Sequence, residues 1–285
     1  MFSPISYLDK TQARYTSALT SYDLLKALAL LLMFVDHVGY FFYPDESWFR
    51  IIGRFSVPIW FFLIGYAGTR KVQGTIWLGA IVLAFSNYIT GEYLLPLNIL
   101  FMLAISRIYI DALMVSSLKS YEAFAGLFFL LFFLTLPTIF MFEYGTMGMM
   151  FAAYGYLRAH KDILKIHSLA YFGFLFAIAL FYCVMSGVFI ASVNYAQMYT
   201  LFGGMALLML VLYLFKPKNF EKISEKVGVL FAPIKLMGRH TLLLYVTHLI
   251  FLRLIMIGQG DPRFGFFEFK IMPPEMLKLM QGLIG

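Results

Sequence analysis

The stretch LLKALALLLMFVDHVGYFFY, residues 24–43, decides what kind of fold this chain adopts. It is long enough for a helix across a bilayer, which needs about 20 mainly apolar residues. Two ionisable residues, Asp36 and His37, interrupt its second half. A charged side chain inside a span costs roughly 2.5–3.5 kcal/mol near the bilayer centre, so such residues usually face a cavity or a partner. The stretch therefore predicts a membrane helix that carries part of a polar site.

Similar apolar runs recur along the whole chain. Of its 285 residues, 61% are hydrophobic and 13% are charged, whereas about a quarter of the residues of a soluble domain are charged. Windows with the length and character of a span are residues 24–43, 51–68, 75–90, 95–113, 122–142, 144–158, 168–190, 195–215 and 240–257. We therefore predict an all-α, polytopic transmembrane bundle with nine spanning helices, or ten if the segment 228–235 also crosses.

The whole chain, residues 1–285, is expected to form a single integral membrane domain, because no repeat, flexible linker or soluble domain interrupts it. Residues 1–23 are polar and are expected to be a cytoplasmic N-terminal segment without a cleavable signal. Residues 258–285 are mixed in character and are expected to lie on the membrane surface as a tail. Cys183 is the one cysteine, so a disulfide framework is excluded.

The distribution of charge predicts the orientation of the bundle. The net charge of +7 comes from short basic clusters between apolar runs, which is typical of membrane loops and not of a nucleic-acid-binding module. If the N-terminus is cytoplasmic, the inside loops hold Arg70, Lys71, Lys119, Arg158, Lys161, Lys165, Lys216, Lys218, Lys222 and Lys226. The outside loops then hold mainly acidic residues, so the positive-inside rule favours this orientation.

Four ionisable residues are expected at similar depth near the outer face. Asp36 and His37 lie in the last turns of the first helix, Arg54 lies in the first turn of the second, and Glu143 lies in the turn between the fifth and sixth. Histidine is the side chain best matched to general-base work near neutral pH, and a carboxylate can fix its tautomer. Arg54 could hold a phosphate, a carboxylate or an anionic intermediate. The alternative is a structural Asp36–Arg54 salt bridge with His37 hydrogen-bonded beside it.

The closing stretch MGRHTLLLYVTHLIFLR, residues 237–253, adds further polar residues. His248 lies inside the last span and is interpreted either as a site residue or as a packing histidine bonded to a hydroxyl. Arg239 and His240 stand at the cytoplasmic end of this helix. A metal site is not expected, because no histidine shows HExxH or a comparable spacing. In the second window, Pro58 is expected to kink the helix.

Three ordered pieces of the chain resemble the TraX family of pilin acetylases. They are LKALALLLMFVDHVGYFF (residues 25–42), RIIGRFSVPIWFFLIGYAGTRK (residues 50–71) and EYGTMGMMFAAYGYL (residues 143–157). The ending is similar to the closing helix of a broader class of membrane acyltransferases. Glu143 departs from the aspartate expected at the acidic-Tyr-Gly turn, and the family's Tyr-Asn-Gly-Lys-like stretch is missing near the seventh helix.

The resemblance implies acyl transfer in the bacterial cytoplasmic (inner) membrane. The donor would be acetyl-CoA or another acyl-CoA on the cytoplasmic side, and the acceptor a hydroxyl or amine of a protein N-terminus, a polysaccharide or a small molecule. In this hypothesis His37 is the general base, Asp36 or Glu143 orients it, and Arg54 stabilises developing charge, with His248 as a further site residue. The donor's phosphates would bind a basic inside edge made of Arg70, Lys71, Arg158, Arg239 and His240.

Two other classes of function compete with this interpretation. One is a small proton-coupled secondary transporter that uses Asp36, His37 and Glu143 as a relay. It is disfavoured because the repeated halves with broken helices that are common in transporters are not visible in the sequence. The other is a non-catalytic membrane assembly factor that has the overall fold of an acyltransferase without its activity.

Overall fold

The computed structural model of this protein describes residues 18–164, 166–190, 193–221 and 230–284. Within these ranges the chain is a bundle of helices with one pair of two-residue strands, β1 (Leu19–Thr20) and β2 (Asn219–Phe220), which run antiparallel. The helices are α1 (Ser21–Phe42), α2 (Ser47–Arg54), α3 (Ser56–Tyr66), α4 (Gly74–Ile89), α5 (Ile99–Ser117), α6 (Tyr121–Ile139), α7 (Gly145–Ala159), α8 (Ser168–Phe189), α9 (Tyr195–Leu214), α11 (Ala232–Arg239), α12 (Thr241–Gly258) and α13 (Pro274–Ile284).

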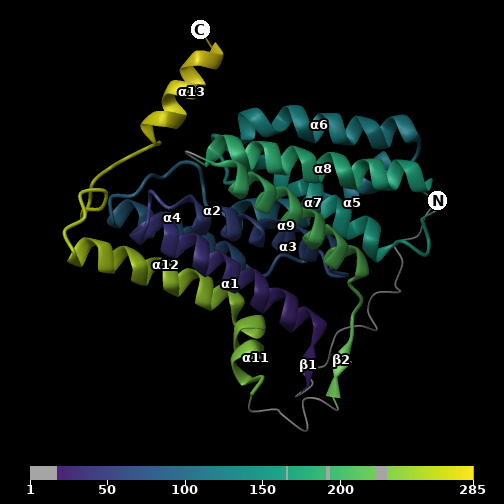
Figure 1. The fold of residues 1–285 in the computed structure, drawn as a ribbon, viewed down its shortest axis with the longest axis horizontal. Coiled ribbons are helices and arrows are strands. Elements are labelled where there is room, and N and C mark those ends of the chain that lie inside the picture. The colour runs from purple at the N-terminus through teal and green to yellow at the C-terminus, as the bar shows by residue number, and fades with distance from the viewer. Residues whose placement is uncertain (1–17, 165, 191–192, 222–229, 285) are drawn as a thin grey trace.

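The predicted all-α, polytopic membrane fold is confirmed. Seven of the described helical segments are long and apolar enough to cross a membrane: Ser21–Phe42, Ser47–Tyr66, Ile99–Ser117, Tyr121–Thr138, Ser168–Phe189, Tyr195–Leu214 and Thr241–Gly258. The other two predicted windows also form helices, α4 and α7, which are shorter. Figure 1 shows α6 and α8 along one side of the bundle and α12 along the opposite side.

Helix α7 lies in the interior of the bundle, where most of its residues are buried. At Gly65 and Gly155 it packs so closely against α3 that no side chain fits there: a Cβ atom added to Gly65 would lie 2.6 Å from the carbonyl carbon of Ala152, and one added to Gly155 would lie 2.8 Å from the amide nitrogen of Tyr66. Small residues permit such close approach of helix backbones in membranes. This contact fixes α3 against the element that carries the acidic turn.

The second predicted window differs from the structure in one respect. The chain between Ser47 and Tyr66 is two helices, which separate at Phe55, and Pro58 lies in the first turn of α3. Proline is tolerated in a first turn because the backbone N–H that it lacks has no partner within the helix there. The interruption therefore lies before the proline, directly after Arg54.

The segment 228–235, considered as a tenth span, is described only from residue 230 onward. It contributes to α11, which has 8 residues and is about 12 Å long at 1.5 Å per residue. This helix is too short to cross a bilayer. Residues 1–17 of the predicted N-terminal segment, together with Lys165, Lys222 and Lys226, lie outside the described residues.

Candidate functional site

A cavity of about 450 Å³ opens at the end of the bundle where α1 finishes and α2 begins. Asp36, His37, Arg54 and Glu143 all line it, although they come from three separate parts of the chain. Its wall also contains two further arginines, a second glutamate and several tyrosines: Arg50, Arg253, Glu92, Tyr40, Tyr93, Tyr144 and Tyr245. Such a concentration of charged side chains within a membrane bundle marks it as the candidate functional site.

Asp36 forms its ion pair with Arg50 and not with Arg54. The Nη1 atom of Arg50 lies 2.6 Å from Oδ2 of Asp36. The alternative interpretation, an Asp36–Arg54 salt bridge, is therefore wrong: Arg50, one helical turn before Arg54 on α2, makes the ion pair instead. A glycine makes the contact possible: a Cβ atom on Gly53 would overlap the Asp36 carboxyl group.

Arg54 is held by two tyrosines. Its Nη1 donates to the hydroxyl of Tyr144 at 2.7 Å, and the hydroxyl of Tyr182 donates to its backbone carbonyl at 2.6 Å. Tyr144 has a φ of 65°, in the left-handed region that bulky residues seldom adopt. Among the described residues, no carboxylate lies within 4.0 Å of the Arg54 guanidinium, and its Nε is buried without a hydrogen-bond partner. Arg54 is therefore positioned at the cavity wall with no carboxylate in direct contact.

His37 is paired with a second histidine from the last long helix. The Nδ1 of His37 lies 2.7 Å from the Nε2 of His248, and Nδ1 of His248 lies 2.8 Å from the carbonyl oxygen of Leu244. A carbonyl oxygen only accepts, so the hydrogen of neutral His248 is on Nδ1 and its Nε2 accepts from Nδ1 of His37. This chain of hydrogen bonds leaves the Nε2 of His37 with a free lone pair, which is the form of imidazole required of a general base.

The expectation that Asp36 or Glu143 orients His37 is wrong, because His248 occupies that position. Glu143 lies in the turn between α6 and α7, where its Oε2 accepts from the backbone N–H of Ile99 at 2.9 Å. Burial raises the pKa of this carboxyl to about 7, and the negative charge of Glu92 adds to the rise. Glu143 thus has a pKa near neutral pH, and its hydrogen bond to Ile99 connects the α6–α7 turn to the start of α5.

Two residues of the cavity were missed as a pair by the sequence reasoning. The Nε of Arg253, on α12, lies 2.5 Å from Oε2 of Glu92, and Nη1 of Arg253 donates to Ser86 at 3.2 Å. Arg253 falls within an apolar span and so requires a partner. Glu92 is too far away in the sequence, in the loop after α4, to be found without the fold.

The predicted donor-binding residues lie away from this cavity, and none of them lines it. Arg70 donates to the carbonyl oxygens of Ile64, Gly65 and Ala67 at the end of α3, and it pairs with Asp111 at 2.7 Å. Arg158 donates to the carbonyl of Tyr213 at 2.7 Å, and Arg239 to that of Ala18 at 2.9 Å. Lys71, Arg239 and His240 are exposed. This basic set lies at the opposite ends of α3, α7 and α12 from the cavity, and several of its members also hold helix ends in place.

Comparison with known proteins gives the family. A model of the TraX protein family matches residues 21–256. The chain belongs to the TraX family. The matched region contains the histidine pair, both ion pairs and Glu143, whereas Pro273 and Met276, which also line the cavity, lie beyond it. Residues 257–285 lie beyond the match.

One curated relative is 35% identical over 88 residues and is an uncharacterized protein of Rickettsia prowazekii (strain Madrid E). The aligned region is 31% of this chain and 36% of the relative, so the chain covers about a third of the relative's length. No solved structure matches the chain.

Proposed function

We propose that this protein is an integral membrane acyltransferase, which moves an acetyl or similar acyl group from acyl-CoA to a hydroxyl or amine acceptor. The observation that carries the proposal is the Leu244–His248–His37 chain of hydrogen bonds. It ends in an imidazole that lines a polar cavity and has one ring nitrogen free to take a proton. Membership of the TraX family, which is associated with pilin acetylation, supports the same chemistry.

In this mechanism the acceptor O–H or N–H gives its proton to Nε2 of His37 as the acceptor atom attacks the thioester carbonyl carbon. The protonated ring then donates from Nδ1 to His248, whose position the Leu244 carbonyl fixes. The oxyanion of the tetrahedral intermediate is stabilised by the Arg54 guanidinium, which no carboxylate contacts directly. When the intermediate collapses, the C–S bond breaks and the coenzyme A thiolate takes the proton from His37. No step needs a covalent acyl-enzyme.

The two reactants would approach from opposite sides of the membrane. The positive-inside pattern of the loops supports a cytoplasmic N-terminus, and then the cavity opens on the outer side of a bacterial inner membrane. The exposed basic residues Lys71, Arg239 and His240 would hold the donor's phosphates on the cytoplasmic side. His37 lies 16 residues beyond Ser21, the first residue of α1, which is about 24 Å along the helix axis. The acyl arm of the donor would therefore thread between the helices to reach the base.

The test is a pair of histidine substitutions with a matched control. His37→Ala should lower acyl transfer from acetyl-CoA by about 10²–10⁴-fold, the usual contribution of a general base. His248→Ala removes a hydrogen bond to a ring that becomes charged, worth about 1.5–3 kcal/mol, and should lower the rate by about 10–150-fold. His160→Ala is the control: its Nδ1 is also bonded to the carbonyl four residues before it, at 2.9 Å, but it does not line the cavity.

The readouts are release of the coenzyme A thiol by membranes that contain the protein and mass spectrometry of acetylated envelope components. The thermal unfolding midpoint of each variant, with and without acetyl-CoA, separates a loss of chemistry from a loss of fold or of donor binding. Full activity of His37→Ala would contradict the proposal. Proton-coupled uptake without thiol release would favour the transporter, and a cellular phenotype that persists without either activity would favour an assembly factor.

A further inference from the structure

The segment 259–273, which we call the strap, connects α12 to α13 and runs back along the end of α4. Backbone hydrogen bonds hold it there. The N–H of Gly265 donates to the carbonyl of Thr90 at 3.1 Å, and the N–H of Phe267 donates to the carbonyl of Ile89 at 2.9 Å. Further along, the N–H of Leu94 donates to the carbonyl of Lys270 at 3.0 Å. The strap is thus an ordered part of this end of the bundle.

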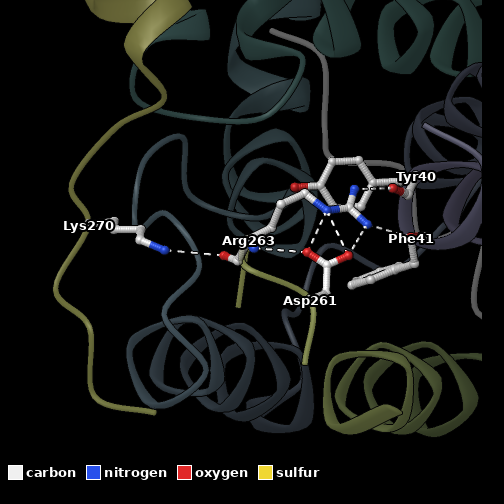
Figure 2. A network of polar contacts seen from close by, with 5 residues as sticks. All are labelled: Tyr40, Phe41, Asp261, Arg263 and Lys270. Atoms are coloured by element: carbon white, nitrogen blue, oxygen red, sulfur yellow. Dashed lines mark hydrogen bonds and ion pairs between the residues drawn. The ribbon is translucent and has the colours of Figure 1, made fainter. Parts of the chain in front are cut away.

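Arg263 ties the strap to α1 as well, as Figure 2 shows. Its guanidinium donates to the carbonyls of Tyr40 at 3.0 Å and Phe41 at 2.6 Å, in the last turn of α1. The carboxylate of Asp261 accepts from the same guanidinium at 2.8–3.2 Å. Lys270 donates to the backbone carbonyl of Arg263 at 3.2 Å, which connects two parts of the strap seven residues apart. Cations bonded to the last carbonyls of a helix stabilise its C-terminus.

Although it is held firmly, the strap presents large apolar rings outward. Phe266 is 57% exposed, Phe267 68% and Phe269 63%. Phe267 has a φ of 59°, a conformation that is unfavourable for a bulky residue. Exposing three phenylalanine rings within four residues to water is unfavourable, because each leaves a large apolar surface hydrated. An apolar environment would remove that hydration cost.

The rings continue the outward face of α4. The ring of Tyr88 lies 6.5 Å from that of Phe267 and 6.2 Å from that of Phe269, measured between centroids. Phe85, one turn before Tyr88 on α4, is also exposed, as are Ile81 and Leu78 further along the helix. In a membrane bundle an exposed apolar helix face of this kind faces lipid. The strap therefore lies where a lipid-facing helix ends, which is the level at which aromatic residues gather in membrane proteins.

We propose that the strap is an interfacial membrane anchor, with Phe266, Phe267 and Phe269 inserted at the boundary between lipid headgroups and acyl chains. Residues 259–284 contain three acidic and three basic side chains, and Arg263–Asp261 and Lys270–Glu268 are paired within the strap. Insertion is therefore hydrophobic and does not depend on anionic lipid. This role concerns how the cavity end meets the membrane and is independent of the proposed acyl transfer.

The test uses nitroxide labels on the full chain in bilayers of zwitterionic phosphatidylcholine. In a Cys183→Ala background, single cysteines are placed as Phe267→Cys and Phe269→Cys. Phe85→Cys on α4 is the lipid control, and Asp45→Cys, in the exposed turn between α1 and α2 at the same end of the bundle, is the water control. The measurement is the ratio of collision rates with oxygen, which concentrates in lipid, to those with a water-soluble nickel chelate. Monodisperse elution and an unchanged unfolding midpoint establish that each labelled chain is folded.

The strap labels should give ratios close to that of the Phe85 label and well above that of the Asp45 label, at both low and high salt. Ratios at 267 and 269 equal to the Asp45 value would place the strap in water and overturn the proposal. Protection from both reagents, together with spin–spin broadening between labels on different molecules, would instead assign the surface to a second copy of the chain and would also overturn it.

Discussion

Replacing Gly65 by alanine tests the packing that holds the site together. The added Cβ would lie 2.6 Å from the carbonyl carbon of Ala152 and 2.9 Å from the amide nitrogen of Tyr156, with the Ala152 oxygen closer still. Carbon atoms pack best at about 3.5–4.0 Å, so α3 and α7 must separate by at least about 1 Å. Backbone atoms cannot rotate aside, so we expect a cost of about 3 kcal/mol, the upper part of the range for overpacking.

The same displacement should reach the cavity. Arg54 precedes α3 and Tyr144 precedes α7, and their 2.7 Å hydrogen bond joins the two elements. A separation of about 1 Å would lengthen this bond beyond hydrogen-bonding distance. We therefore expect Gly65→Ala to lose acyl transfer as well as stability, although Gly65 does not line the cavity.

The assay is reversible unfolding in mixed detergent micelles, followed by circular dichroism. Gly126→Ala, on α6, is the matched control, because a Cβ there meets nothing within 4 Å. This control should be neutral or stabilising by up to about 1 kcal/mol, since alanine favours helix over glycine. If the unfolding free energy of Gly65→Ala lay within about 0.5 kcal/mol of that of Gly126→Ala, the close-packing argument would be refuted.

Three further predictions follow from the polar contacts. A double-mutant cycle should give a coupling free energy of about 0.5–3 kcal/mol between Asp36 and Arg50 and a smaller one between Asp36 and Arg54; equal couplings would contradict the pairing. The folded-state pKa of Glu143, about 7, lies above its ordinary 4.5, so its stabilising contribution is complete below pH 4.5 and is lost as the pH rises through 7. Relative to Glu143→Gln, the native chain should lose about 3 kcal/mol of unfolding free energy as the pH rises from 4.5 through 7. If the unfolding free energies of the two proteins changed with pH in parallel, the raised pKa of Glu143 would be contradicted. Arg263→Ala should speed amide hydrogen exchange in the strap, because the bonds to α1 are lost; unchanged exchange there would mean that the backbone contacts alone hold it.

Much of the architecture could be predicted because the bilayer allows few solutions. A chain that crosses lipid must satisfy its backbone hydrogen bonds within each segment, so long apolar runs become helices. The run around Asp36 forms α1 as expected, and even the two short windows form helices. The interruption at Phe55 was not predicted, because Pro58 suggested a kink at its own position and the polar residues Arg54 and Ser56 beside Phe55 were read as part of one continuous helix.

The grouping of Asp36, His37, Arg54 and Glu143 could also be anticipated. Each lies near a helix end on the same side of the bundle, and depth along a helix can be counted from the sequence. The structure brings all four to one cavity. The depth of a residue in the membrane does not determine which way its side chain points around the helix, however. The sequence therefore did not indicate that Asp36 contacts Arg50 or that His37 contacts His248.

The sequence by itself determined that this protein is a helical membrane bundle and at which level its ionisable residues lie, since both follow from apolar length and local spacing. Only the tertiary structure decided that His37 meets His248, which is 211 residues away, and that Asp36 pairs with Arg50. Those choices depend on how α1, α2 and α12 cross and rotate against one another. Glycines such as Gly53 set that geometry through close contact, and no local pattern records it.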